Sequence, residues 1–231
     1  MGDVKFERSP KDRDRNARYK AMLRTLIKRL FLVLGIIVTL PLILLCLLEE
    51  LLCGRDCERV YGFGKELLAA VPTIIGEYLR LGFYRCVCSH ISVDVALMYN
   101  SMLAHRDVTI GPGVVVGVGT IIGKAVIEEG VLFGARVSLL SGKYQHGRPG
   151  VRVLGAPKGE FASITIGAHS WIGQQSVVMA NVGRGCTIGA GSVLMKDAPD
   201  NTTFMGNPAR KVNIEPKRAD KDYSNKSEAE S

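Results

Sequence analysis

The pattern of apolar positions divides this chain sharply. Residues 30–48 form an unbroken apolar run, LFLVLGIIVTLPLILLCLL, with no charged side chain. A helix of this length can cross the hydrocarbon core of a bilayer, and a helix buried in a soluble protein is rarely apolar on every side. We therefore predict a retained membrane segment over residues 30–52.

A cleaved signal peptide is the competing interpretation of the apolar run. The basic region before the run is longer than a signal peptide needs. Glu49 and Glu50 follow the run where a cleavage site would place small residues. A retained segment therefore fits the sequence better.

Residues 72–88, PTIIGEYLRLGFYRCVC, have an amphipathic pattern, and Pro72 stands where a helix can start. The apolar side comprises Ile75, Leu79, Phe83 and Cys86, and the opposite side comprises Glu77, Arg80 and Tyr84. We assign residues 53–107 to a linker and an amphipathic membrane-surface helix. Packing of this helix on the following domain is an equally good alternative.

Residues 108–211 carry a six-residue repeat. An apolar leader is usually followed by Gly, and the fifth residue is usually small or Val. The ten leaders are Ile110, Val116, Ile122, Ile127, Phe133, Ile166, Ile172, Val178, Val182 and Ile188, and the units at Ile122 and Val178 are shortened. Three units would close one triangular coil with the leaders inside, and coils would stack at the strand spacing of about 4.8 Å. The repeat predicts a parallel β-helix.

A long interruption at residues 141–161 breaks the repeat and carries His146, one of four histidines. Imidazole has a near-neutral pKa and can take a proton from an acceptor hydroxyl or amine. A histidine in an exposed loop is often incidental. His90, His105 and His169 lie outside the loop. The polar tail, residues 212–231, lacks periodicity and is expected to be disordered.

Charge and cysteine content indicate the class of binding partner and the redox environment of the chain. Residues 1–29, the basic head, hold ten Lys/Arg against four Asp/Glu, whereas the rest of the chain is nearly balanced. A one-sided basic head favours an anionic surface, and without aromatic residues between the basic ones it does not indicate nucleic acid. The six cysteines are scattered, which is typical of reduced, unpaired thiols facing the cytosol.

Four motifs in residues 164–210 occur in a fixed order: Trp171-Ile-Gly, Ile188-Gly-Ala-Gly-Ser, Lys196-Asp and Gly206-Asn-Pro-Ala-Arg210. In this region the chain resembles the hexapeptide-repeat acyltransferases, and among them the acetyl-CoA-dependent O-acetyltransferases of sugars. The preceding part, with its membrane segment and HRDVTIG, resembles acyltransferases of bacterial surface-polysaccharide assembly. The resemblance implies a left-handed parallel β-helix, although generic crossover rules would favour the opposite hand.

The resemblance also implies a site. Acetyl-CoA would lie in a groove between two β-helices of a homotrimer, and the loop at residues 141–161 would complete the site of a neighbouring subunit. His146 in this loop would be the general base, with His90, His105 and His169 as weaker candidates. Backbone near Gly173, Ala190 and Gly191 would approach the pantetheine, and backbone N–H groups at coil corners could stabilise the oxyanion. Lys196 and Arg210 would meet the nucleotide phosphates, and Trp171 would pack near the thiol and the acceptor.

Several alternatives stay open. Lys196 and Arg210 could be solvated charges, and Trp171 could be a corner-packing aromatic. Arg136 stands where related sugar acetyltransferases carry Asn, and Met195 stands where they often carry Thr. The acceptor is expected to be a sugar of a lipid-linked or surface-polysaccharide precursor, with N-acetylation also open. A non-catalytic scaffold is the alternative function.

Other enzyme classes fit poorly. A zinc carbonic anhydrase of this fold needs three His ligands, whereas His146 and His169 are far apart with no close partner, so no metal is expected. A nucleotidyltransferase would need an N-terminal phosphate-binding domain, for which the membrane segment leaves no room.

The membrane topology raises a conflict. The basic head should stay in the cytoplasm, so a single span would place the β-helix outside, away from acetyl-CoA. Pro41 lies near the middle of the run and can break a helix. We therefore expect a re-entrant segment bent at Pro41, with the β-helix on the cytoplasmic face of the bacterial inner membrane. An inverted head or an exported β-helix is the alternative.

Overall fold

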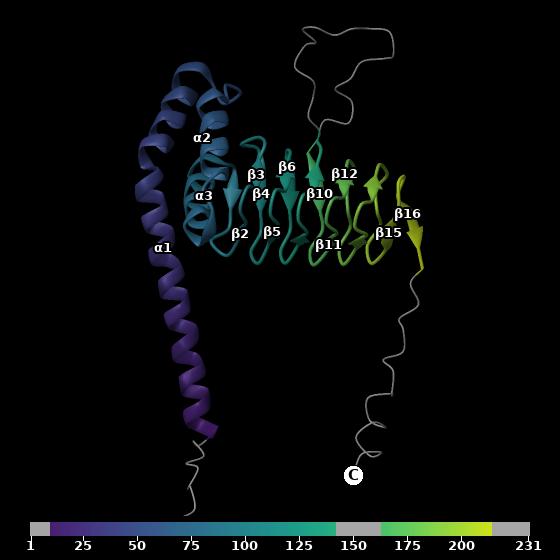
Figure 1. Cartoon of the computed structure of the whole chain (residues 1–231), viewed down its shortest axis with the longest axis horizontal. Coiled ribbons are helices and arrows are strands. Elements are labelled where there is room, and N and C mark those ends of the chain that lie inside the picture. The colour runs from purple at the N-terminus through teal and green to yellow at the C-terminus, as the bar shows by residue number, and fades with distance from the viewer. Residues whose placement is uncertain (1–9, 142–162, 214–231) are drawn as a thin grey trace, which may run out of the picture.

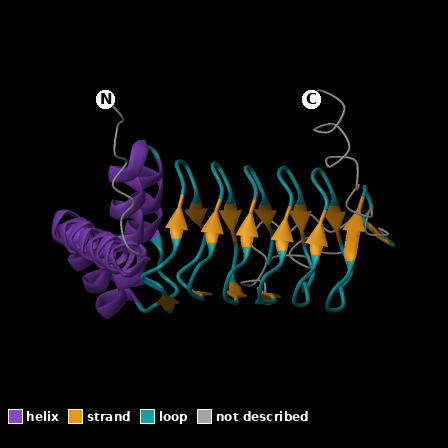
Figure 2. Cartoon of the chain, turned by 90° about the horizontal axis from the view of Figure 1, so that it is seen from below, coloured by secondary structure: helices purple, strands orange, loops and turns teal. Residues whose placement is uncertain are grey.

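The computed structural model describes residues 10–141 and 163–213. Three helices, α1 (Pro10–Cys53), α2 (Arg59–Ala69) and α3 (Thr73–Val87), gather at one end of a solenoid of short strands (Figure 1). The strands repeat along three faces of the solenoid (Figure 2). The helices therefore form a cap on one end of a β-solenoid of about five turns.

Three sheets, named A, B and C here, form the three faces. Sheet A contains β1 (His90–Ile91), β4 (Val108–Ile110), β7 (Ala125–Ile127) and β10 (Ile164–Ile166). Sheet B contains β2 (Ala96–Leu97), β5 (Val115–Val116), β8 (Leu132–Phe133), β11 (Trp171–Ile172), β13 (Thr187–Ile188), β15 (Thr203–Met205) and β16 (Arg210–Val212). Sheet C contains β3 (Met102–Leu103), β6 (Ile121–Ile122), β9 (Ser138–Leu139), β12 (Val177–Val178) and β14 (Val193–Leu194). The paired strands are parallel except β15 with β16.

The strand register confirms the repeat and its two shortened units. Ile110 pairs with Ile127 across the short unit at Ile122. Val178 pairs with Leu194 across the short unit that it begins itself. All ten leaders are buried along the solenoid axis, and so are fifth-position residues such as Val114, Val131, Val137, Ser170, Ser176 and Ser192. The core is therefore a narrow stack of leaders.

The solenoid begins one coil before residue 108. Ile91, Leu97 and Leu103 are buried leaders at the same six-residue spacing. Their strands β1, β2 and β3 pair in parallel with β4, β5 and β6. This coil lacks the Gly that follows most leaders, because Ser92, Met98 and Ala104 stand there. Residues 90–107 thus belong to the solenoid and not to the linker.

The amphipathic segment forms α3, which packs between α1 and the first coil. Glycines allow a close crossing of the two helices: a Cβ on Gly35 would lie 2.4 Å from Tyr78 O, and one on Gly82 would lie 2.8 Å from Ile36 N. The rings of Phe31 and Tyr78 stack at 5.4 Å. The alternative of packing on the following domain is therefore the one observed.

The buried face of α3 differs from the predicted one. Arg80 and Tyr84, expected on the polar side, are fully buried, whereas Ile75 is exposed. Arg80 is satisfied because its guanidinium donates to Leu97 O at 3.0 and 3.1 Å, and to the carbonyls of Leu68 and Val71 at 2.9 and 2.8 Å. One side chain thus joins the end of α2, α3 and β2.

The helix α1 continues through Pro41, contrary to the break expected there. It curves toward α2 in its last turns without interruption (Figure 1). Residues on both sides of the proline pack against the rest of the chain, since Gly35 and Ile43 are buried. Tertiary packing holds the two halves in one helix despite the missing backbone hydrogen bond.

Candidate functional site

The interruption of the repeat, residues 141–161, falls between β9 of sheet C and β10 of sheet A. It therefore falls at the corner between these two sheets. His146 falls in residues 142–162 and lies outside the described residues. Its assignment as the base stays a prediction.

The residues predicted to approach pantetheine come together at one corner, between sheets B and C. A Cβ on Gly173 would lie 2.5 Å from Ala190 N, so no larger residue fits under the next coil. Gly191 has a positive φ of 67°, and a Cβ there would meet nothing within 4 Å. The corner is thus tight between coils at Gly173 and open to the outside at Gly191.

Several backbone N–H groups at this corner already donate hydrogen bonds between coils. Gly119, Arg136, Gln175 and Gly191 all have left-handed backbone conformations at the B–C corner. Their N–H groups donate to carbonyls of the preceding coil at 2.7 to 3.0 Å. These four amides hold the coils together and do not supply the oxyanion donors that were expected at the corners.

Arg136 occupies one of these left-handed positions, with φ of 57°. Asn and Gly adopt this conformation more readily than Arg does. Arg in place of Asn therefore strains the backbone at this corner, in the coil that precedes residues 141–161. The Arg136 side chain is exposed.

Trp171 lies on the outer face of sheet B. It pairs in register with Leu132 on one side and Thr187 on the other. Trp171 is 45% exposed, and Leu132 beside it is exposed to a similar extent. Trp171 therefore presents an apolar surface to the outside of the coil, two residues before the Gly173 corner.

Lys196 and Arg210 are both exposed. The strand β16, which begins at Arg210, lies at the end of the solenoid away from the helices (Figure 1). Lys196 follows β14, and Arg210 begins β16. The turn before Arg210 is tied to β14, because Ala209 N–H donates to Val193 O at 2.8 Å. Two exposed cations thus lie on the last coils, Lys196 beyond the end of β14 and Arg210 beside the start of β14.

His169 and His105, unlike His146, lie within the described residues, and the structure shows the surroundings of each. His169 fills a left-handed corner position, with φ of 57°, and its side chain is largely exposed, as expected for a solvated turn residue. His105 lies 2.9 Å from Glu58, measured from Nδ1 to Oε2. Glu58 also accepts the backbone N–H of Arg106 at 2.9 Å, so it fixes the start of the turn between β3 and β4.

Sequence reasoning missed a buried charge cluster at the first coil. The Arg106 side chain is 1% exposed and donates to Glu49 at 3.3 Å and to Glu50 at 3.0 Å. Its guanidinium also lies 5.5 Å from the centroid of the Tyr61 ring. No periodic signal links these residues, because the carboxylates end the apolar run and the arginine sits in the solenoid.

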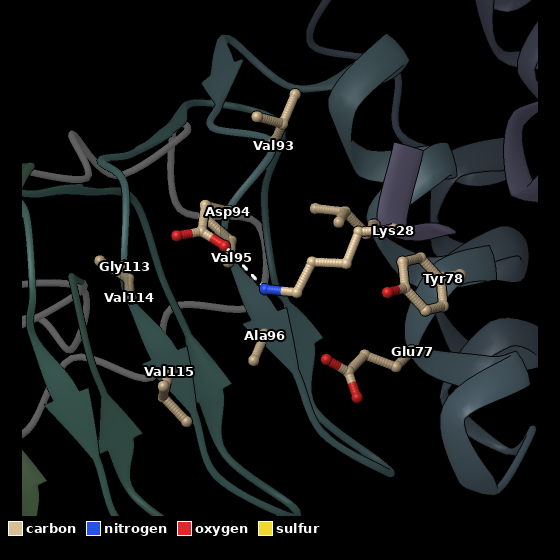
Figure 3. A pocket seen from close by; sticks show the side chains of 11 residues that line it. Lys28, Glu77, Tyr78, Val93, Asp94, Val95, Ala96, Gly113, Val114 and Val115 are labelled. Atoms are coloured by element: carbon tan, nitrogen blue, oxygen red, sulfur yellow. Dashed lines mark hydrogen bonds and ion pairs between the residues drawn. The ribbon is translucent and has the colours of Figure 1, made fainter. Parts of the chain in front are cut away.

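A cleft of about 250 Å³ opens between the helices and the first two coils. Lys28 of α1 reaches across it to Asp94, with 3.1 Å between Nζ and Oδ1, and the Glu77 carboxylate points into it (Figure 3). Burial raises the pKa of Glu77 above its usual value, although Arg80 and Lys28 act in the other direction. Within residues 10–141 and 163–213 no group of three or more His, Cys, Asp or Glu could hold a metal ion.

Comparison with known proteins identifies the class of fold. No protein-family model matches the chain. A provisionally named acetyltransferase of Staphylococcus aureus (strain MRSA252) is 43% identical over 51 residues, which cover 21% of this chain and 26% of the relative. The chain thus matches about a quarter of the length of such curated relatives.

Solved structures match far more of the chain. A maltose O-acetyltransferase from Clostridium difficile 630 superposes with a TM-score of 0.58 at 24% identity, covering 68% of this chain and 87% of the other. A hexapeptide-repeat-containing acetyltransferase of Vibrio cholerae, solved with acetyl coenzyme A, gives a TM-score of 0.58 at 20% identity, covering 72% and 96%. The structural neighbours are hexapeptide-repeat acetyltransferases, and the solenoid is the left-handed parallel β-helix that was predicted.

Proposed function

We propose that the protein is an acetyl-CoA-dependent acetyltransferase that O-acetylates a sugar of a lipid-linked or surface-polysaccharide precursor. The observation that carries this proposal is the match of 68% and 72% of the chain to two acetyltransferases, one of them solved with acetyl coenzyme A. The short, more identical match to a Staphylococcus aureus relative supports the same chemistry.

The proposed chemistry is a direct transfer. His146 accepts the proton of the sugar hydroxyl, and the oxygen attacks the thioester carbonyl of acetyl-CoA. The tetrahedral intermediate collapses with cleavage of the carbon–sulfur bond, and His146 returns its proton to the departing CoA thiolate. The products are the acetyl ester and free CoA, and no metal takes part.

The donor site uses the open B–C corner. Ala190 and Gly191 offer backbone with little side chain, which suits the narrow pantetheine, and Gly173 keeps the coils close beneath it. Lys196 and Arg210 are exposed at the same end of the solenoid, where they can pair with the phosphates. Trp171 supplies the apolar surface beside the thiol and the acceptor.

A homotrimer would complete the site, because one β-helix offers only one wall of a groove. The loop with His146 belongs to one subunit and the corner with Gly191 to its neighbour. The outer faces of sheets B and C carry half-exposed apolar residues, among them Leu132, Ile121 and Trp171, which favour contact with another chain.

The same enzyme would work at the cytoplasmic face of a bacterial inner membrane. Residues Thr25–Cys53 form a helix long and apolar enough to cross a bilayer, and an 18-residue window of it has a mean hydropathy of 3.0. Only 28% of that window is buried by the rest of the described chain. Association with membrane lipid would bring the enzyme to a lipid-linked acceptor.

Acetyl-CoA binding and turnover of the full-length protein in detergent test the proposal. The wild type should bind acetyl-CoA and transfer acetyl to a membrane glycan fraction, and His146→Ala should keep binding but lose transfer. His169→Asn is the matched control, because Asn tolerates the left-handed backbone of that exposed position. A protein that binds no acetyl-CoA would instead be a scaffold.

A further inference from the structure

Both ends of the apolar run of α1 are joined to the same coil of the solenoid. Near its start, Lys28 Nζ lies 3.1 Å from Asp94 Oδ1. At its other end, Glu50 accepts a hydrogen bond from Arg106 at 3.0 Å. Asp94 precedes β2 and Arg106 follows β3, so both belong to the first coil. The run therefore lies across the end of the solenoid, as Figure 1 shows.

The middle of the run is held in the same way. Gly35 packs against the backbone of Tyr78 in α3, and Phe31 stacks on the Tyr78 ring. Two residues further along α3, Arg80 donates to Leu97 O of the first coil. The layers are therefore α1, α3 and the first coil, in contact along the length of the run.

This packing is incompatible with α1 crossing a bilayer. If the axis of α1 stood along the membrane normal, the first coil would lie at the depth of the hydrocarbon core. Asp94, Asn100 and Asp107 of that coil are exposed. Charged side chains and irregular backbone facing lipid are strongly disfavoured.

The side of α1 that faces away from α3 is a bare apolar stripe. Its members at helical spacing are 49% to 66% exposed: Leu30, Leu34, Ile37, Leu44 and Leu48. The opposite side, which is buried against the protein, carries Leu32, Gly35, Thr39, Ile43 and Cys46. The all-round apolarity of the run is thus explained, because one side packs on protein and the other is left for a second apolar environment.

Charge indicates what that environment is. The basic head, residues 1–29, adjoins the stripe and carries ten Lys/Arg against four Asp/Glu. At the far end, Glu49 turns inward to Arg106, and its side chain is only 8% exposed. A bare apolar stripe continuous with a basic segment matches the surface of an anionic phospholipid bilayer.

The geometry points to an in-plane membrane anchor: α1 lies parallel to the bilayer, with the Leu30–Leu48 stripe in one leaflet and its basic part, residues 10–29, among anionic phospholipid headgroups. The solenoid then projects into the aqueous phase, and head and solenoid are on the same side. This inference rests on the proposed membrane association but not on the proposed acetyl transfer. It removes the topological conflict without a break at Pro41.

Depth measurement in vesicles tests the orientation. Spin labels are placed at Leu30→Cys, Ile37→Cys and Leu48→Cys of the full chain, in vesicles of phosphatidylcholine and phosphatidylglycerol. The exposed or half-exposed Cys53, Cys57 and Cys86 are changed to Ser, while the buried Cys46, Cys88 and Cys186 stay. Accessibility to oxygen and to a water-soluble nickel reagent then gives the depth of each label.

An in-plane helix predicts the same depth at all three positions, within a few ångströms. A spanning helix predicts that Ile37 lies about 10 Å deeper than Leu30, from a rise of about 1.5 Å per residue, and this result would overturn the inference. A label at Gln174→Cys, exposed on a middle coil, is the aqueous control and should show no contact with lipid.

A second measurement needs no spin label. Changing Arg13, Arg15 and Arg18 to Gln should lower flotation with phosphatidylglycerol-containing vesicles at least tenfold, and leave the small binding to pure phosphatidylcholine unchanged. The lipid assignment would be refuted if the wild type and the triple variant bound equally to vesicles with and without phosphatidylglycerol. It would also be refuted if neither vesicle were bound and the stripe were buried between copies of this chain. In-plane labels on an inactive protein would instead contradict only the proposed acetyl transfer.

Discussion

Arg106 and Glu50 lie 56 positions apart in the chain and are joined by a 3.0 Å hydrogen bond. This contact fastens the end of the apolar helix to the first coil of the β-helix. Because the Arg106 side chain is almost fully buried, the contact is not a surface ion pair that solvent can replace. It fixes the helical cap, and with it the exposed apolar stripe of α1, relative to the solenoid.

Arg106→Met should destabilise the protein strongly. Removing the arginine leaves the buried Glu49 carboxylate without its counter-charge, and breaking a buried ion pair in this way costs about 3–5 kcal/mol. The control is Arg184→Met, which removes an exposed pair with Glu128 at 3.1 Å and should cost at most about 1 kcal/mol. Urea unfolding in detergent measures both, and equal losses for the two variants would contradict the role of Arg106.

Glu58 should make stability depend on acid pH. Burial raises the pKa of Glu58, but the hydrogen bonds to His105 and to Arg106 N–H, with the charges of His105 and Lys65, bring that pKa below its usual value. A carboxyl with a lowered pKa in the folded state stabilises the fold above the unfolded-state pKa, about 4.3 for Glu. That contribution is lost as pH falls through the folded-state pKa.

Thermal unfolding against pH measures this effect. In the wild type the melting temperature should fall as pH drops below the ordinary Glu range, and Glu58→Gln should fall less steeply there. Parallel curves for the two proteins would show that Glu58 is not a source of the acid sensitivity.

Glu77 should affect the pH dependence of stability in the direction opposite to Glu58. Burial raises the pKa of Glu77, with Arg80 and Lys28 offsetting only part of the effect. The folded state then favours the protonated carboxyl, so its contribution declines as pH rises through the ordinary Glu range toward the folded-state pKa. The Gln variant should be more stable than the wild type at neutral pH and no more stable in acid, which thermal unfolding at both pH values checks. A destabilised variant at neutral pH would argue against this reasoning.

Lys196→Ala and Arg210→Ala should weaken CoA binding by about tenfold each, the scale of one charge-assisted contact. Because the expected partners are phosphates, binding of a short acetyl thioester should change much less. Calorimetric titration with CoA, dephospho-CoA and the short thioester distinguishes the contacts. Similar losses for all three ligands would mean that the two side chains do not pair with phosphate.

His146→Ala should lower kcat by about 10²–10⁴-fold, the usual effect of losing a general base. If the loop completes the site of a neighbouring subunit, mixing His146→Ala with Lys196→Ala/Arg210→Ala should restore part of the activity. Such mixed trimers contain some sites with an intact His146 and intact cations. The absence of any recovery after subunit exchange, or a fully active monomer, would contradict the trimeric site.

The β-helix could be predicted from sequence because its signal is local and repeated. Every unit places one apolar leader in the core, and most place a small residue or Val at the fifth position, so ten units reinforce one another. The first coil was not predicted from the repeat because Ser92, Met98 and Ala104 stand where glycine follows most leaders. Its leaders, Ile91 and Leu97 among them, are as deeply buried as the later ones.

The helical cap could not be predicted as readily, because its packing depends on contacts between distant segments. Arg80 is charged, yet it is buried because its guanidinium donates four hydrogen bonds to three backbone carbonyls. Pro41 weakens a helix locally, but packing on both sides of it keeps α1 continuous. The corner position of Gly173 and Gly191 was predictable from the repeat, whereas the use of the corner amides between coils was not.

The most direct test of acetyl transfer is mass spectrometry of glycans and lipid-linked intermediates from matched cells. The strains carry the wild-type gene, no gene, His146→Ala or the control His169→Asn. We predict a sugar that bears one additional acetyl group in the wild-type and His169→Asn strains and is missing from the other two. Identical glycan and intermediate profiles in all four strains would contradict the account.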